Sequence, residues 1–184
     1  MIWIAKNPEG GWRAWILAAE MDYLLHLPAR LREVLRKPDF TSKVLERLFP
    51  RAFPDDPQAE ADYQALLRDD LLRQKLENVE AFEKCLASRK EFKLPPAVMA
   101  QLELGGEEAK LVQVDLAEED LSRWLSTFHD LRLLIGTKLD VTDESWEKEI
   151  DPRDPEAHEL QLLHRLAYFE EMIIEALREA ERLR

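Results

Sequence analysis

Apolar residues recur at every third or fourth position over much of this 184-residue chain, and this spacing restricts its fold more than any other feature. Residues with this spacing share one face of an α-helix, whereas residues that alternate share one face of a β-strand. The clearest example follows Asp115, which we expect to cap a long helix. The apolar face of this predicted helix comprises Leu121, Trp124, Leu125, Phe128, Leu131 and Ile135.

The last part of the chain predicts a second long helix, from Asp154-Pro155 to about Arg182. Aspartate followed by proline favours a helix start, because the carboxylate accepts unpaired N–H groups and proline has none. Between Leu162 and Leu177 this helix is apolar around more than half of its circumference. Such a helix is covered on several sides. We therefore expect it at the centre of a bundle or at the seam of a homodimer.

Two short segments near the beginning of the chain alternate instead. "IWIA" and "WRAWIL" flank the turn-forming sequence "KNPEGG", so residues 1–17 predict a β-hairpin. "KLVQVD", residues 110–115, predicts a further strand that could join the hairpin. We therefore expect a mainly α fold, a multi-helix bundle with a small antiparallel β-sheet. The expected single domain covers residues 1–184, with helices in 18–88 and 116–183 and a connector in 89–109.

Two pairs of aspartates, Asp55–Asp56 and Asp69–Asp70, lie close together before and within a helical pattern. Asp55 or Asp56 precedes Pro57, which predicts a helix start there. The apolar register slips near Asp69–Asp70, so we expect the helix to bend or a second helix to begin. A helix start would explain both pairs.

Two further helix boundaries are expected in the first part of the chain. Pro28 cannot donate a hydrogen bond inside a helix, so it predicts either the start of a new helix or a kink. A short helix is expected over residues 41–48, with Thr41 as its cap.

The formal net charge of −12 is unevenly distributed. Residues 1–51 hold 9 Lys or Arg and 6 Asp or Glu, whereas residues 52–184 hold 17 and 32. Nucleic acids and anionic membranes attract basic surfaces, so neither is an expected partner. No stretch has the ~18 apolar residues of a membrane-spanning helix, and the first residues do not resemble a signal peptide. With the single cysteine, these features favour a soluble cytoplasmic protein.

The residues of common catalytic and metal sites lack the required spacing. His158 and His164 are six positions apart, not the four that bring two rings together on a helix. Cys85 lies within a predicted helix without a basic partner in sequence, so we interpret it as a structural thiol. No nucleophile, phosphate-loop or dinucleotide motif is present. The sequence therefore predicts no metal, no cofactor and no catalytic residue, and enzymatic activity is not favoured.

Arg132 is the most unusual polar residue of the predicted helices. It lies in line with Leu125 and Phe128, although a leucine beside it could carry the buried face instead. A buried guanidinium cannot lose its charge and requires a carboxylate or carbonyls. We expect Arg132 to pair with Asp69 or Asp70, and these three residues are the candidate binding residues.

Two segments resemble the best-recognised blocks of a bacterial family, DUF2017: "LFPRAFPDDPQAEADYQALLRDDL" and "WLSTFHDLRLLIGTKLDVTDE". The second block of that family usually reads like W-L-x-x-L-N-D-L-R-L-x-L-G-T-R-L. Here Phe128 and His129 stand in place of Leu and Asn, and Lys138 in place of Arg. The positions that match recurring residues of the family are Asp55, Asp56, Asp69, Asp70, Asp130, Arg132 and Gly136.

The resemblance implies a cytosolic protein but no known activity, cofactor or catalytic residue. Genes of the family often neighbour that of the adaptor of the Clp protease, which implies a link to regulated proteolysis.

Three functions remain open from the sequence. The favoured one is a non-enzymatic interaction or regulatory protein, monomeric or homodimeric, that binds an unidentified protein partner. The loops around Phe53 and Trp146 would then contact the partner, unless both rings instead cover the ends of neighbouring helices. The second is a small-ligand-binding protein or enzyme that uses Arg132 with aspartates. The third and least favoured is a DNA-binding regulator that uses residues 28–51.

Overall fold

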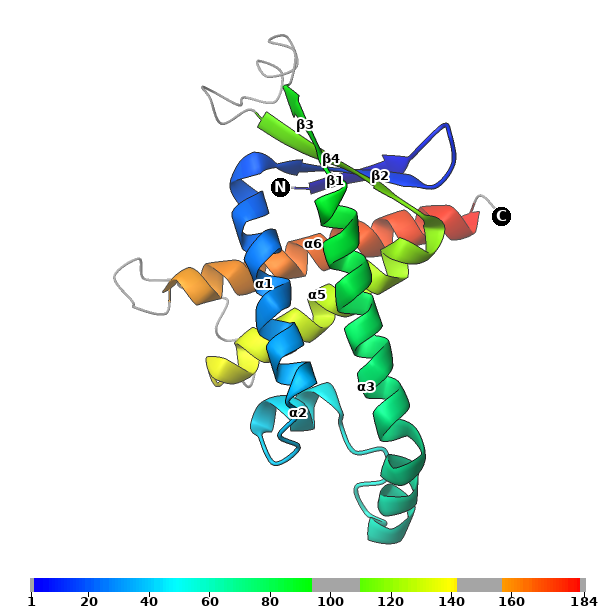
Figure 1. Cartoon of the computed structure of the whole chain (residues 1–184), viewed down its shortest axis with the longest axis vertical. Helices are drawn as coiled ribbons and strands as arrows, with labels where there is room; N and C mark the ends of the chain where they lie inside the picture. Colours follow the sequence, from blue (N-terminus) through cyan, green and yellow to red (C-terminus); the bar gives the residue numbers. More distant parts are fainter. Residues whose placement is uncertain (1, 94–109, 142–156, 183–184) are drawn as a thin grey trace.

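The computed structural model describes residues 2–93, 110–141 and 157–182, which form helices packed beneath a small β-sheet (Figure 1). No helix in these ranges is long and apolar enough to cross a membrane. The elements are β1 (Ile2–Lys6), β2 (Trp12–Leu17), α1 (Ala18–Arg36), α2 (Lys43–Leu48), α3 (Pro57–Ala87), β3 (Lys90–Lys93), β4 (Lys110–Leu116), α5 (Glu118–Lys138) and α6 (Ala157–Arg182). The predicted mainly α fold with a small antiparallel sheet is confirmed.

The sheet has the strand order β1-β2-β4-β3, and all neighbouring strands are antiparallel. The predicted hairpin is therefore β1 and β2, and the strand predicted at 110–115 is β4, which pairs with β2. Ile2, Ile16 and Val112 lie in one row across three strands and are buried. Gly11 in the hairpin turn has φ +73°, and a Cβ atom there would lie 2.4 Å from the carbonyl oxygen of Leu116. Only glycine fits that approach.

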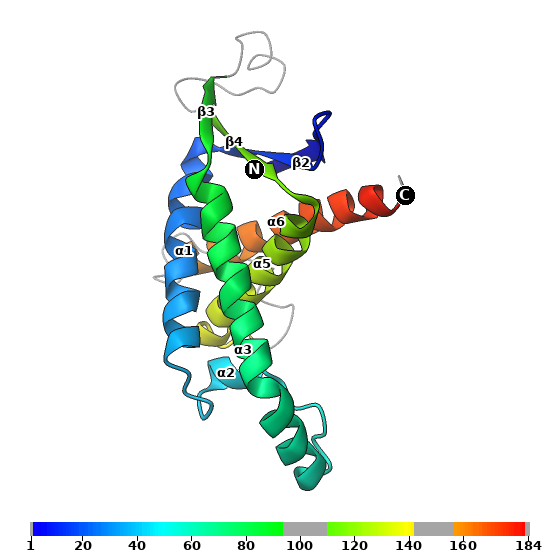
Figure 2. The same cartoon turned by 45° about the vertical axis from the view of Figure 1, so that its right-hand side comes forward.

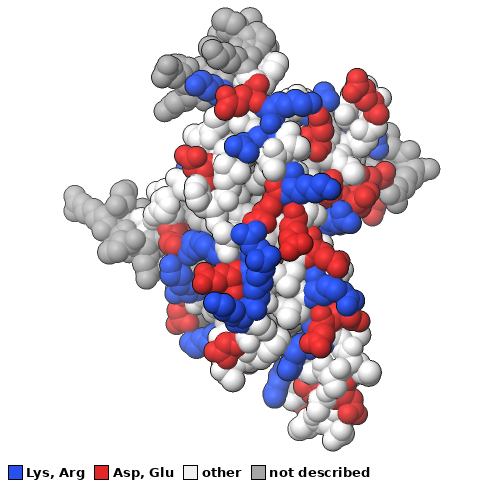
Figure 3. Space-filling model, viewed as in Figure 1, with Lys and Arg blue, Asp and Glu red and all other residues white. Residues whose placement is uncertain are grey.

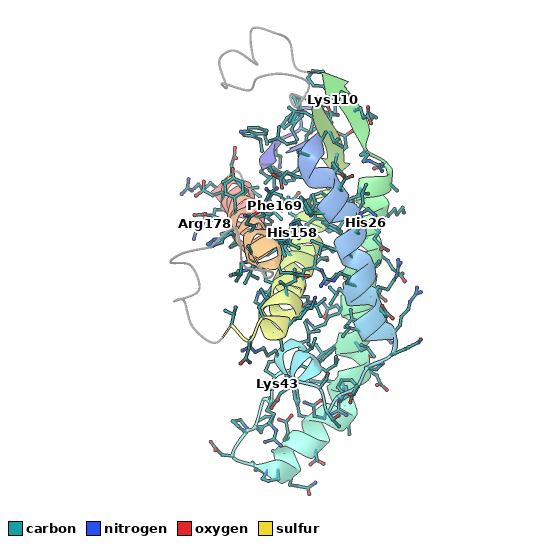
Figure 4. The ribbon with its side chains drawn as sticks, turned by 90° about the vertical axis from the view of Figure 1, so that its left-hand side faces the viewer. His26, Lys43, Lys110, His158, Phe169 and Arg178 are labelled. Atoms are coloured by element: carbon teal, nitrogen blue, oxygen red, sulfur yellow. The ribbon has the colours of Figure 1, made fainter. Side chains whose placement is uncertain are left out.

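The helix at the centre of the bundle is α5, which contacts α1, α2, α3, α6 and β4. Figure 4 shows α6 at one side of the bundle, with α5 between it and α3. Of the two places expected for the last helix, the centre of the bundle is therefore wrong, because α6 packs on α5 and β1 and leaves Tyr168 and Ile174 exposed. The homodimer seam stays a prediction. Its predicted start at Asp154-Pro155 lies outside the described residues.

Four aromatic rings fill the space between α3, α5 and α6. Phe128 of α5 contacts the other three, with ring centroids 5.2 Å from Phe82, 6.0 Å from Trp124 and 5.5 Å from Phe169. Each of the four side chains is at most 2% exposed. The apolar face predicted for α5 is confirmed, since Leu121, Leu131 and Ile135 are also fully buried.

Several predicted helix boundaries are wrong by a few residues because a neighbouring side chain does the capping. The N-cap of α2 is Ser42, which accepts from the N–H of Leu45, whereas the Thr41 hydroxyl donates to Asp39. The carboxylate of Asp120 accepts from the N–H of Ala117, the N-cap residue of α5, and the predicted cap Asp115 pairs with Arg13 on the sheet instead.

Neither Pro28 nor the second aspartate pair begins a helix. Helix α1 continues through Pro28, which is buried. Helix α3 is one uninterrupted helix of 31 residues, so Asp69–Asp70 lies within it and caps nothing. Its first part, residues 57–70, projects from the body of the molecule (Figure 2). We call this part the arm.

The first aspartate pair does start a helix, as predicted. Asp56 is the N-cap of α3, and its carboxylate accepts from the N–H groups of Gln58 at 3.1 Å and Ala59 at 3.0 Å. Asp56→Ala is expected to lower the free energy of unfolding by about 1 kcal/mol, because two N–H groups lose their acceptor. Asp55→Ala is the matched control, and urea unfolding of both variants measures the difference. Equal values would show that the cap contributes nothing.

Candidate functional site

Arg132 lies on α5 and pairs with Glu170 of α6, not with an aspartate of α3. Its Nη1 donates to Oε2 of Glu170, a residue that is 7% exposed. The arginine side chain is 34% exposed, so the pair is only partly buried. The requirement for a carboxylate partner was predicted correctly, but the partner was not.

Asp69 and Asp70 are exposed on the arm, where no other helix covers them. Asp70 pairs with Arg73 on its own helix at 2.8 Å. The predicted pairing with Arg132 is wrong. It was suggested by the slip in the apolar register near Asp69–Asp70, and this slip does not mark a buried turn of the helix. The structure therefore does not bring the three candidate binding residues together.

The residues next to Arg132 on α5 make two further polar contacts. Asp130 is 2% exposed and accepts a hydrogen bond from Lys75 of α3 at 2.6 Å. Burial raises the pKa of Asp130 above its ordinary value, and Lys75 opposes that shift. His129 Nδ1 lies 3.6 Å from Glu170 Oε1, and this nearby carboxylate raises the pKa of the imidazole.

These contacts connect α3, α5 and α6 through three residues of one sequence block, His129, Asp130 and Arg132. Sequence reasoning did not assign a contact to Asp130. No local signal separates it from His129, which lies between the same two buried residues, Phe128 and Leu131, and is exposed. The partner of Asp130 could not be named without the orientation of α3.

A hollow of about 180 Å³ lies beside Arg132. Within the part of the chain that the structure describes, its lining contains three basic side chains and no carboxylate. Arg47 of α2, one of the three, donates from Nη2 to the carbonyl oxygen of Val141 at 3.0 Å. The lining residues are Arg47, His129, Arg132, Leu133, Gly136, Val141 and Leu163.

A larger hollow, of about 820 Å³, lies between α2 and the arm, and we call it the α2–α3 groove. Arg68 of the arm stacks on Phe40, with its guanidinium 4.4 Å from the ring centroid. Buried Glu60 accepts from the N–H of Phe53 at 2.8 Å, and this hydrogen bond lowers the pKa of Glu60. The apolar lining residues are Phe40, Leu45, Phe49, Pro57, Ala61 and Ala65, and the charged ones are Glu46, Arg51, Glu60 and Arg68.

The described residues offer little for thiol or metal chemistry. Burial raises the pKa of the Cys85 thiol to about 11, so the nucleophilic thiolate is scarce at neutral pH. Within residues 2–93, 110–141 and 157–182, no three His, Cys, Asp or Glu side chains are grouped to hold a metal ion. The predicted absence of a metal stays a prediction, which metal analysis of the dialysed protein would test.

Arg132→Met is expected to lower the free energy of unfolding by about 1–3 kcal/mol, because it leaves the buried carboxylate of Glu170 without its donor. Urea unfolding would measure the loss. Arg123→Met on the same helix is the control, since Arg123 forms a more exposed pair with Asp120 at 3.4 Å. The control is expected to lose less than about 1 kcal/mol. If both variants lose the same amount, the Arg132–Glu170 pair behaves as a surface pair.

A family model described as a domain of unknown function, DUF2017, matches residues 4–177 of the chain. No curated protein and no solved structure matches.

Proposed function

The chain belongs to the DUF2017 family, whose description names no activity, and we propose that it is a non-enzymatic protein that binds another protein in the α2–α3 groove. The volume of the groove, about 820 Å³, carries the proposal. It falls within the range of known small-molecule pockets, and its lining combines apolar and charged side chains.

Exposed apolar side chains on the arm and just before it support a protein partner. Leu66 is 77% exposed, Leu67 41% and Phe53 46%. Apolar side chains gathered on one exposed segment are typical of protein–protein contact sites. Phe53 also packs against Tyr63 with ring centroids 5.9 Å apart, so it both covers the arm and remains accessible. Trp146, the other predicted contact, lies outside the described residues.

The charge of the arm indicates the chemistry of the partner. The exposed acids Asp55, Asp62, Asp69 and Asp70 lie on the arm or just before it. Figure 3 shows this lower end of the molecule as largely uncharged surface with acidic side chains near its tip. We therefore propose a partner segment with basic side chains beside an apolar ridge, since complementary charge favours association.

The cytoplasmic location and the link to regulated proteolysis remain proposals that rest on the single cysteine and on the family resemblance. They make the adaptor of the Clp protease the first purified protein to test.

The groove is tested by one substitution on the arm. Ala65→Glu changes an exposed residue that lines the groove, so the fold is expected to persist with an unchanged melting temperature. The affinity for the partner is expected to fall at least about tenfold, because a buried unpaired charge would replace an apolar contact. Phe92→Glu on β3 is the control, since Phe92 is 45% exposed and lies on the sheet, away from the groove.

Affinity is measured by calorimetry with a purified partner, first the Clp adaptor and then any protein captured by the wild type. If Ala65→Glu binds as tightly as wild type and Phe92→Glu, the groove is not the binding surface.

A further inference from the structure

We propose that the hollow beside Arg132 is a second binding site, and that it takes a small organic oxyanion, a carboxylate or a phosphate monoester. The three basic side chains Arg47, His129 and Arg132 line it from α2 and α5. The site is separate from the α2–α3 groove, and the inference does not depend on the proposed protein partner.

The charge of the lining is the first argument. The whole chain carries −12, yet among the described residues no carboxylate lines this hollow. Glu170 pairs with Arg132 from α6, and Asp130 pairs with Lys75 toward α3. Arg47 donates to a carbonyl, which does not neutralise its charge, and within the described residues no carboxylate pairs with it. The hollow therefore keeps an excess of positive charge, which favours an anion.

An unused donor is the second argument. Arg132 Nε is buried and has no hydrogen-bond partner among the described residues. Buried N–H groups are almost always paired, so this one calls for an acceptor. Oxyanions match the guanidinium because two N–H groups of one arginine can donate to two oxygens of the same group. Nη1 already donates to Glu170, so among the described residues Nε is the Arg132 donor that lacks an acceptor.

The glycine in the lining is the third argument. Gly136 lies in the last turn of α5, where a Cβ atom would have only one neighbour, Val141 Cβ at 4.0 Å. Alanine would fit there, and it is the better helix residue. Glycine makes the helix less stable than alanine would and leaves this part of the hollow empty. This indicates that the empty volume serves to bind a ligand.

The size and the apolar wall indicate the rest of the ligand. A volume of 180 Å³ corresponds to about six waters at ~30 Å³ each. Leu133, Val141 and Leu163 form the apolar part of the wall. A small organic group attached to the oxyanion would cover these three side chains.

The test is NMR of the arginine Nε–H signals during titration with inorganic phosphate and, separately, with isobutyrate. Sodium chloride keeps the ionic strength constant. The Arg132 and Arg47 signals are expected to shift and to saturate with at least one probe. Arg36 of α1 is the internal control, because its side chain is 60% exposed and lies away from the hollow. Shifts that never saturate, or that are equal at Arg36, would overturn the proposal.

Two variants make the test specific to the hollow. Gly136→Ala is expected to raise the melting temperature and to weaken binding by about tenfold, because the added methyl group occupies ligand space. Arg47→Gln is expected to weaken binding by a similar factor, with Arg36→Gln unchanged. Gly136→Ala is expected to fold stably. Its binding affinity can therefore be interpreted even if Arg47→Gln folds poorly. Wild-type affinity in a folded Gly136→Ala would exclude this hollow as the site.

Discussion

Lys75→Met is expected to lower the free energy of unfolding by about 3–5 kcal/mol at neutral pH, because it leaves a buried carboxylate without a counter-charge. Lys75 Nζ lies 2.6 Å from Asp130 Oδ1, and the side chains of the two residues are 21% and 3% exposed. The lysine also lies 5.6 Å from the centre of the Phe49 ring, a contact that methionine keeps only in part.

The loss is expected to depend on pH in a defined direction. Burial raises the folded-state pKa of Asp130 above the ordinary 3.8, and Lys75 opposes this shift. Without Lys75 the folded-state pKa of Asp130 rises further. Between 3.8 and that value the folded state binds more protons than the unfolded state, so stability falls as pH rises. The loss of unfolding free energy in Lys75→Met is therefore small at a pH near the ordinary pKa of aspartate. It is largest at a pH above the folded-state pKa of Asp130.

Urea unfolding across this pH range measures the effect. Arg73→Met is the matched control two residues earlier on α3, since the side chains of Arg73 and its partner Asp70 are 67% and 60% exposed. Its expected loss is about 0.5 kcal/mol or less. Adding Asp130→Asn to Lys75→Met removes both charges and is expected to recover part of the loss. A deficit for Lys75→Met that matches the control at every pH would contradict burial of the pair.

Phe128→Ala is expected to lower the free energy of unfolding by about 3–5 kcal/mol, because it opens a cavity in a fully buried site. The ring contacts Phe82, Trp124 and Phe169, which belong to three different helices. Each of these ring pairs adds about 0.5–1.5 kcal/mol beyond the area it buries.

Phe128→Leu is the matched control, because leucine keeps most of the side-chain volume. Leucine is also the residue usual at this position in the sequence block of the family that the chain resembles. Its expected loss is below about 1.5 kcal/mol. Urea unfolding followed by tryptophan fluorescence measures both variants, since Trp124 lies 6.0 Å from the Phe128 ring. If alanine costs no more than leucine at this position, the aromatic cluster is not closely packed.

The elements that were predicted correctly are those whose signals are local. The apolar face of α5 and the N-cap Asp56 depend on residues within one or two turns of a helix. The hairpin likewise follows from alternation around a glycine turn. The choice between neighbouring caps is less certain, because Thr41 and Ser42 both carry the required hydroxyl and only the fold selects one.

The candidate site was predicted only in part because its contacts join distant segments. The sequence indicates that Arg132 needs a carboxylate, but selecting Glu170 requires the packing of α6 on α5. The error at Asp69–Asp70 has a different cause. Leu66 and Leu67 are exposed on the arm, so the spacing of apolar residues does not describe a buried face there. A register slip in an uncovered helix carries no information about bending.

The contact between β1 and α6 has a consequence for the order in which the chain folds during synthesis. These elements are separated by about 150 residues, and Tyr168 of α6 reaches the carbonyl oxygen of Ile2 at 3.5 Å. The hairpin emerges from the ribosome before β4 and α6, yet it gains its sheet partner only with β4, and β1 gains its helical cover only with α6. Pairings of such high sequence separation slow folding. The nascent hairpin must therefore remain incompletely covered until translation reaches the last helix.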